Sequence, residues 1–231
     1  SGGMLTKTKG LVISNMRYRE SSLLVTIYTA ECGITTYIEN GVRSVKAKHK
    51  MALFQPLTLL DLEVFHKPGK GIHRISSAKC YYPYRKIPFD IAYSSIALFL
   101  SEVLSKVLKE EEANPVLFEF LESSFQFLDQ APGHTENFHL QFLWNLTEFL
   151  GFYPGLVSEF LEQLRVAGVP GLAGIDSEAL SALFHAEYGQ EVLMKRGQRQ
   201  AVLAALIYYY QLHMESFGDL RSLQILQEVL S

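Results

Sequence analysis

Apolar and polar residues alternate with a period of two in the first third of the chain, over residues 4–80. Within residues 60–64 three apolar residues alternate with two carboxylates, which is typical of a strand with one buried face. Residues 23–29 are rich in β-branched and aromatic side chains, and the Pro-Gly segment at residues 67–71 predicts a turn before a closing strand over residues 72–79. About five short strands in so short a segment predict a small barrel of the OB type. An SH3-like barrel would give a similar pattern.

The period changes to that of helices in residues 81–231. Asp90 is placed to cap a first helix, and Asn114 followed by Pro115 is typical of the start of a second. A third helix is expected to end at Gly151. Further helices are predicted near residues 157–167, 177–188 and 199–214, with a loop over residues 168–174 and a short helix at the end. The fold class predicted is therefore α+β, with a barrel domain at residues 4–80 and an all-helical domain at residues 81–231.

The net charge of −3 hides two segments of opposite charge. Residues 1–86 hold 14 Lys and Arg against 5 Asp and Glu, a net charge of +9, whereas residues 87–231 hold 7 against 19, a net charge of −12. A basic first segment favours a polyanionic partner for that segment alone. The two segments could also attract and partly neutralise each other.

The cations of the first segment gather in predicted turns and loops. The densest group lies between two predicted strands, in residues 41–50. Such a group favours a nucleic-acid backbone, because each neutralised phosphate releases condensed counterions. The candidate DNA-binding residues are Arg17, Arg19, Arg43, Lys46, Lys48, Lys50, Lys67, Lys70 and Arg74. A merely solvated loop is the alternative for residues 41–50.

Aromatic residues on a barrel can stack on nucleobases. Tyr18, Tyr28 and Tyr37 are possible stacking residues, but packing in the barrel is the favoured interpretation for each.

No set of residues indicates catalysis. The spacing of His134 and His139 does not match a metalloprotease motif, and we interpret them as residues of a helix start. Cys32 and Cys80 are too few for a structural zinc site or a disulfide framework. Lys70 lies in no phosphate-binding P-loop. We therefore expect no enzyme activity, metal, cofactor, small-molecule substrate or membrane span, and we expect a cytoplasmic protein.

Several motifs resemble those of the bacterial RecO family. An opening Gly-Leu-Val-Ile strand is followed by Tyr-Arg-Glu-Ser and a Leu-Val-Thr strand, then by Gly-Val-Arg and Gln-Pro-Leu with Leu-Asp-Leu-Glu. Downstream, Leu-Gly-Phe-Tyr-Pro and Arg-Ser-Leu are similar to family segments. In chain order the motifs occupy residues 10–13, 18–29, 41–43, 55–63, 150–154 and 221–223.

This resemblance implies an OB-fold domain followed by a helical domain. It also implies a mediator in DNA repair that binds single- and double-stranded DNA, anneals complementary strands and, with RecR, assists RecA loading on DNA coated by the single-strand binding protein SSB. The implied location is the bacterial cytoplasm at the nucleoid. Many family members carry a four-cysteine zinc module, and because no cysteine follows Cys80 we expect none here.

The resemblance further implies that the helical domain binds the acidic tail of SSB. Such a tail requires an apolar groove beside a cation. The few candidates are Arg165, Lys195, Arg196 and Arg199, each of which could also be an ordinary surface charge. Two other functions remain open: a non-catalytic OB-fold adaptor that binds RNA or an acidic protein, and a hydrolase with an unrecognised site.

Overall fold

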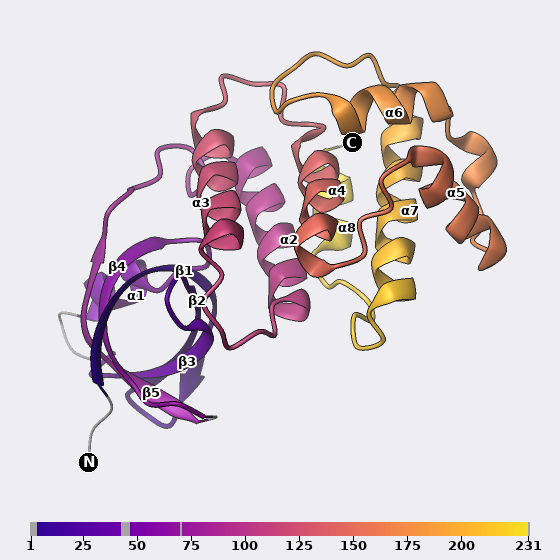
Figure 1. Cartoon of the computed structure of the whole chain (residues 1–231). Coiled ribbons are helices and arrows are strands. Elements are labelled where there is room, and N and C mark those ends of the chain that lie inside the picture. Colours follow the sequence, from indigo (N-terminus) through magenta and orange to yellow (C-terminus); the bar gives the residue numbers. More distant parts are fainter. Residues whose placement is uncertain (1–3, 43–46, 70, 231) are drawn as a thin grey trace.

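The computed structural model describes residues 4–42, 47–69 and 71–230 and has two parts, a β-barrel and a group of helices beside it (Figure 1). The barrel elements are β1 (Met4–Tyr18), β2 (Ser22–Thr29), β3 (Gly33–Asn40), α1 (Ala47–Leu53), β4 (Leu59–His66) and β5 (Ile72–Cys80). The helical part comprises α2 (Ile91–Val107), α3 (Pro115–Gln130), α4 (Phe138–Leu150), α5 (Val157–Val166), the short 3₁₀ helix η1 (Leu172–Gly174), α6 (Ser177–His185), α7 (Arg196–His213) and α8 (Leu223–Val229). The predicted α+β class is confirmed.

The five strands close into a barrel in the order β1-β2-β3-β5-β4, with β4 paired back to β1. All neighbouring pairs are antiparallel except β3 and β5, which run parallel over only three residue pairs, Thr36–Ile72 to Ile38–Arg74. A five-stranded closed barrel in this order is the OB fold. The strand order therefore decides against the SH3-like alternative.

Strand β1 is long enough to pair with two neighbouring strands. Its first half pairs with β4 and its second half with β2, with a register shift between Val12 and Ser14. Gly10 lies where the strand turns from one neighbour to the other, and a Cβ atom there would be 2.6 Å from Ile27 Cγ2 and 2.7 Å from Leu62 Cδ1. A side chain at this position would overlap the barrel core, so a glycine permits the bend.

Helix α1 closes one end of the barrel. Phe54 follows it directly, is buried in the barrel core, and its carbonyl accepts a hydrogen bond of 2.8 Å from Asn15 Nδ2. Lys48 and Lys50 therefore lie on a helix, and the prediction that they lie in a loop was wrong. Arg17 likewise lies within β1 rather than in the turn that follows it.

The predicted helix ends are largely confirmed. Asp90 caps α2 by accepting from Ala92 N, Asn114 caps α3 by accepting from Leu117 N, and Gly151 ends α4 with a φ of 88°. Helix α6 ends at His185, three residues earlier than predicted. The loop expected over residues 168–174 contains the 3₁₀ turn η1.

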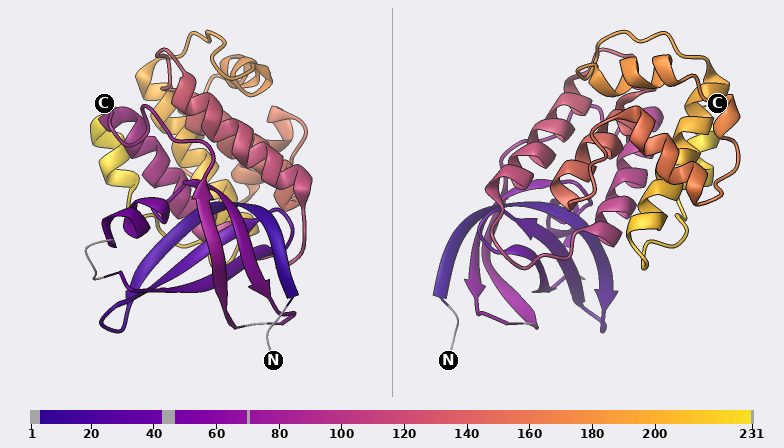
Figure 2. Two further views of the ribbon diagram at one scale, coloured as in Figure 1. Left: turned by 90° about the vertical axis from the view of Figure 1, so that its left-hand side faces the viewer. Right: turned by 45° about the vertical axis from the view of Figure 1, so that its right-hand side comes forward.

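The barrel and the helices share one apolar core. Leu11, Ile13, Tyr28, Leu57 and Leu59 of the barrel belong to the same buried cluster as the apolar faces of α2 to α8. Figure 2 shows the helices packed against one side of the barrel, which leaves the opposite side and the turn ends free. The barrel is therefore held in a fixed orientation on the helices.

A buried carboxylate holds the segment that joins the two parts. Asp129, in α3, is 3% exposed and accepts hydrogen bonds from the backbone N–H groups of Arg85, Lys86 and Ile87 at 2.8–3.0 Å. The Ile87 donor is buried and the other two are part-buried, and the one carboxylate compensates all three for lost contact with water. The side chain thus fixes the path of the linker after β5.

We expect Asp129→Ala to lower the free energy of unfolding by about 3 kcal/mol, because it leaves the buried N–H group of Ile87 and two part-buried N–H groups without their acceptor. Thermal and urea unfolding of the purified variant measure this loss. Asp219→Ala, which removes an exposed carboxylate, is the control and should change stability by less than about 0.5 kcal/mol. Equal stability of the two variants would contradict the role given to Asp129.

We expect Gly33→Ala to destabilise the protein by at least about 2 kcal/mol. Gly33 has a φ of 69°, and a Cβ atom there would be 2.4 Å from the carbonyl oxygen of Glu110, in the segment between α2 and α3. Gly197→Ala is the matched control, since that glycine lies in α7 with open space around it and alanine favours the helix. Calorimetric melting of both variants tests the prediction. It fails if the Gly33→Ala variant has the same melting temperature as the wild type.

Candidate nucleic-acid interface

The β1–β2 hairpin carries two exposed arginines. Arg17 lies near the end of β1, and Arg19 lies in the turn with a φ of 56°. The guanidinium of Arg19 lies 4.9 Å from the centroid of the Tyr18 ring, which orients it by a cation–π contact. The hairpin thus presents two fixed charges to solvent.

The sheet register brings a third arginine toward this hairpin. Met16 pairs with Leu24, Leu24 pairs with Ile38, and Ile38 pairs with Arg74 of β5. Neighbouring strands are about 4.8 Å apart, so the backbone of Arg74 lies within three strand spacings, about 14 Å, of Met16, the residue before Arg17. Residues 57 positions apart in the sequence therefore share one region of the barrel.

Helix α1 adds two lysines, of which one is partly engaged. Lys48 is exposed, whereas Lys50 donates a hydrogen bond of 2.7 Å to the carbonyl of Asn40 and lies 4.0 Å from Glu39. Burial raises the pKa of Glu39, and the nearby Lys50 ammonium opposes that shift. Lys50 therefore anchors α1 to the end of β3, and Lys48 is the freer charge.

Lys67 is exposed in the turn between β4 and β5, two residues beyond Phe65, the partner of Arg74. Three other candidates, Arg43, Lys46 and Lys70, lie outside the described residues and stay predictions. The described candidate cations thus come from the β1–β2 hairpin, α1 and the β4–β5 hairpin, and the sheet register relates Arg17 of the first to Arg74 of the last.

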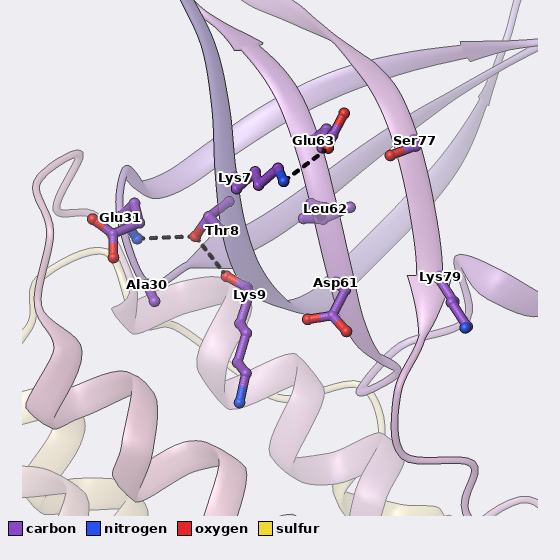
Figure 3. Close-up of a pocket in the computed structure, with 10 residues that line it drawn as sticks. All are labelled: Lys7, Thr8, Lys9, Ala30, Glu31, Asp61, Leu62, Glu63, Ser77 and Lys79. Atoms are coloured by element: carbon purple, nitrogen blue, oxygen red, sulfur yellow. Dashed lines mark hydrogen bonds and ion pairs between the residues drawn. The ribbon is translucent and has the colours of Figure 1, made fainter.

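A different face of the barrel carries lysines that the sequence reasoning missed. Lys7, Lys9 and Lys79 line a hollow of about 580 Å³ over β1, β4 and β5, together with Glu31, Asp61 and Glu63 (Figure 3). Lys7 Nζ lies 3.7 Å from Glu63, and Lys9 Nζ lies 3.7 Å from Glu122 of α3 and 4.8 Å from the Tyr81 ring centroid. This face has no surplus of positive charge among the side chains that line it. The period-two spacing of Lys7 and Lys9 was the signal that could have placed them on one outer face.

Two of the three tyrosines considered as stacking residues are buried, as the favoured interpretation predicted. Tyr28 is 1% and Tyr37 0% exposed. Burial, with Glu110 nearby, raises the pKa of Tyr28 to about 12. Tyr18 is half-buried beneath Arg19. Neither Tyr28 nor Tyr37 can therefore meet a base at the surface.

In the helical part, two of the four candidate cations meet at one hollow. Arg196 and Arg199 of α7 line it with Leu203, Leu226 and Leu230, and its volume is about 40 Å³. Arg165 is elsewhere, paired with Glu162 on α5, and Lys195 directly precedes α7. Of the four candidates, Arg196 and Arg199 therefore lie beside an apolar surface, whereas Arg165 and Lys195 do not line this hollow.

His134 and His139, which lie near each other in the sequence, have different environments. His134 is exposed, 4.0 Å from Glu136, whereas His139 is 3% exposed and lines the floor of the hollow beside Arg199. Burial, with Arg199 nearby, lowers the pKa of His139 to about 3, so its ring is neutral. Within residues 4–42, 47–69 and 71–230 no group of three His, Cys, Asp or Glu side chains is placed to hold a metal ion.

The closed barrel with exposed cations, followed by a domain made only of helices, places the protein in the class of OB-fold proteins that carry an attached helical domain. The family model described as Recombination protein O N terminal matches residues 4–84, and the one described as Recombination protein O C terminal matches residues 88–224. The chain belongs to the RecO family, whose role is in DNA repair and recombination.

Curated relatives extend over the whole chain. A protein of Phocaeicola vulgatus named DNA repair protein RecO is 36% identical, with 99% of this chain and 100% of the relative covered. Proteins of the same name from Bacteroides fragilis and Flavobacterium psychrophilum are 35% and 33% identical, with 98% and 99% of this chain and 99% and 100% of the relatives covered. None of the described helices is long and apolar enough to cross a membrane.

Proposed function

We propose that this protein is a recombination mediator that binds single- and double-stranded DNA through the phosphate backbone, without reading sequence. It acts by electrostatics rather than by bond chemistry, needs no cofactor, and works in the bacterial cytoplasm at the nucleoid. One observation supports this most strongly: exposed cations from three separate segments lie on the same barrel, Arg17 and Arg19 on the β1–β2 hairpin, Lys48 on α1 and Arg74 on β5, and the sheet register links Met16, beside Arg17, to Arg74. Phosphate contacts of this kind position DNA without specifying its sequence.

Strand annealing follows from the same surface. Two complementary strands repel each other through their phosphates, and a cationic surface that binds both lowers this repulsion. We propose that the protein anneals strands in this way and, together with RecR, assists the loading of RecA on SSB-coated DNA. Family membership supports these two partnerships.

We further propose that the acidic tail of SSB binds at the Arg196–Arg199 hollow. The two guanidinium groups suit a carboxylate, and Leu203, Leu226 and Leu230 suit an apolar end residue. The Nδ1 atom of His139 is buried there with no hydrogen-bond partner among the residues the structure describes. The hollow is small, so the tail would lie across it and insert one side chain.

Removal of Arg17 and Arg74 together, both to Ala, should weaken binding of oligonucleotides of every sequence. The slope of log K against log salt on single strands should become shallower by about 0.7 for each lost phosphate contact, about 1.4 in all. Fluorescence anisotropy titrations at several salt concentrations measure the slope.

The control for that pair is Lys7→Ala with Lys79→Ala, which removes the same charge from the mixed-charge face and should leave the slope unchanged. Equal effects of both pairs would mean that only net charge matters. Weak DNA binding by the wild type, with tight binding to RNA or to one acidic protein, would favour the adaptor function instead.

The tail site makes a separate prediction. Arg196→Ala with Arg199→Ala should weaken binding of a synthetic SSB tail peptide by at least about tenfold, since each lost bond to a charged group is worth about 1.5–3 kcal/mol. Isothermal titration calorimetry gives the affinity. Arg165→Ala with Lys195→Ala is the charge-matched control and should retain wild-type affinity; a larger loss in this control would move the site away from the hollow.

A further inference from the structure

The barrel has a gap beside the first half of β3. Parallel pairing with β5 begins only at Thr36, and the backbone N–H of Ile34 instead donates a hydrogen bond of 2.9 Å to the carbonyl of Glu110. A cavity of about 480 Å³ lies between this unpaired edge and the turn that joins β4 to β5. This volume is within the range of about 300–1,000 Å³ that is usual for small-molecule sites.

Two histidine rings form a platform at this cavity. His66, at the end of β4, and His73, near the start of β5, both line it and are stacked, with ring centroids 5.6 Å apart and planes inclined by 17°. The buried Tyr37 ring meets His73 edge-on, at a centroid distance of 6.2 Å, and helps to fix it. The Nδ1 atom of His66 is buried and has no hydrogen-bond partner in the part of the chain that the structure describes.

The polar groups of the cavity favour a neutral ring over a phosphate. Thr35, Thr36 and Glu111 also line it. The hydroxyls can donate or accept hydrogen bonds, and the carboxylate accepts them from ring N–H and amino groups but repels a phosphate. Lys67 and Arg74, by contrast, are exposed next to the cavity in sequence and are not among the residues that line it. The volume and the lining are thus suited to a flat polar ring, and the cations outside are suited to the phosphates of the chain that carries it.

We infer that the cavity binds an unpaired nucleobase of single-stranded DNA, which stacks on the His66–His73 pair while the flanking phosphates meet Lys67 and Arg74. Every base has a face that can stack, so this site needs no sequence preference. A paired base cannot enter without leaving its duplex. The inference rests on the proposed DNA binding and adds a site that distinguishes single from double strands.

The test combines changes in the protein with changes in the DNA. His66→Ala with His73→Ala should weaken binding of a single-stranded oligonucleotide by about tenfold, equivalent to about 1.4 kcal/mol, and leave duplex binding within about twofold. His66→Phe with His73→Phe keeps the stacked rings and should retain single-strand affinity. Lys67→Ala is the control on the same hairpin and should weaken both kinds of DNA alike.

An oligonucleotide with abasic sites at every position tests the same contact from the other side. Wild-type protein should bind it about tenfold more weakly than the normal strand, whereas the double alanine variant should bind the two strands equally. Because this comparison uses the unmodified protein, it decides the matter even if the alanine variant does not fold.

The outcomes separate this inference from the proposed function. Wild-type protein that binds neither single nor double strands would overturn the proposed function. Wild-type protein that binds normal and abasic strands equally would leave the function intact and overturn the base site. Loss of single-strand affinity in the phenylalanine variant would also overturn stacking, because it would mean that the histidines act through their charge or nitrogen atoms.

Discussion

The arrangement of the whole molecule depends on how the barrel is attached to the helices. Asp129 accepts hydrogen bonds from three consecutive backbone N–H groups of the linker, so the chain leaves β5 along a single path. Tyr81 and Lys9 both contact Glu122 of α3, which adds polar contacts beside the shared apolar core. A large apolar interface of this kind opposes relative motion of the two parts. The surfaces that the barrel presents to a partner are consequently fixed with respect to the helical domain.

The same attachment determines which cations of the barrel lie beside carboxylates and which are exposed to solvent. Lys9, next to the acidic helical part, lies beside Glu122, and Lys7 lies beside Glu63. Attraction between the basic and acidic segments therefore exists, as the charge count allowed, in the Lys9–Glu122 pair. The Lys7–Glu63 pair lies within the barrel itself. Arg17 and Arg74 are exposed on the hairpins. A cation already paired with a carboxylate, such as Lys7 or Lys9, gains less from a phosphate, so the exposed Arg17 and Arg74 are better placed to attract a polyanion.

Local patterns in the sequence predicted the elements well. The alternation in β4 and the caps at Asp90, Asn114 and Gly151 depend on residues a few positions apart, and each was found where expected. The parallel pairing of β3 with β5 depends on long-range register, for which one sequence carries no direct signal, whereas His66 and His73 meet across the β4–β5 hairpin, whose turn the sequence did predict. Helix α1 was missed because its basic residues resemble a solvated loop. Among the described candidates for DNA binding, that same register relates Arg17 to Arg74, while the role of all the candidates stays a prediction.

A second contact between the barrel and the helical part, that of Gly33 and Ile34 with Glu110, shapes the cavity. Gly33 has to approach Glu110 closely, and the N–H of Ile34 is occupied by the Glu110 carbonyl, so β3 cannot pair with β5 along its first half. The barrel therefore stays open at that edge, and Glu111, the next residue, lines the opening. A carboxylate held there by the backbone of the junction excludes phosphates from the gap and leaves the bases as the part of a DNA strand that fits. In this way the docking of the helical domain decides which part of a polyanion each region of the barrel can contact.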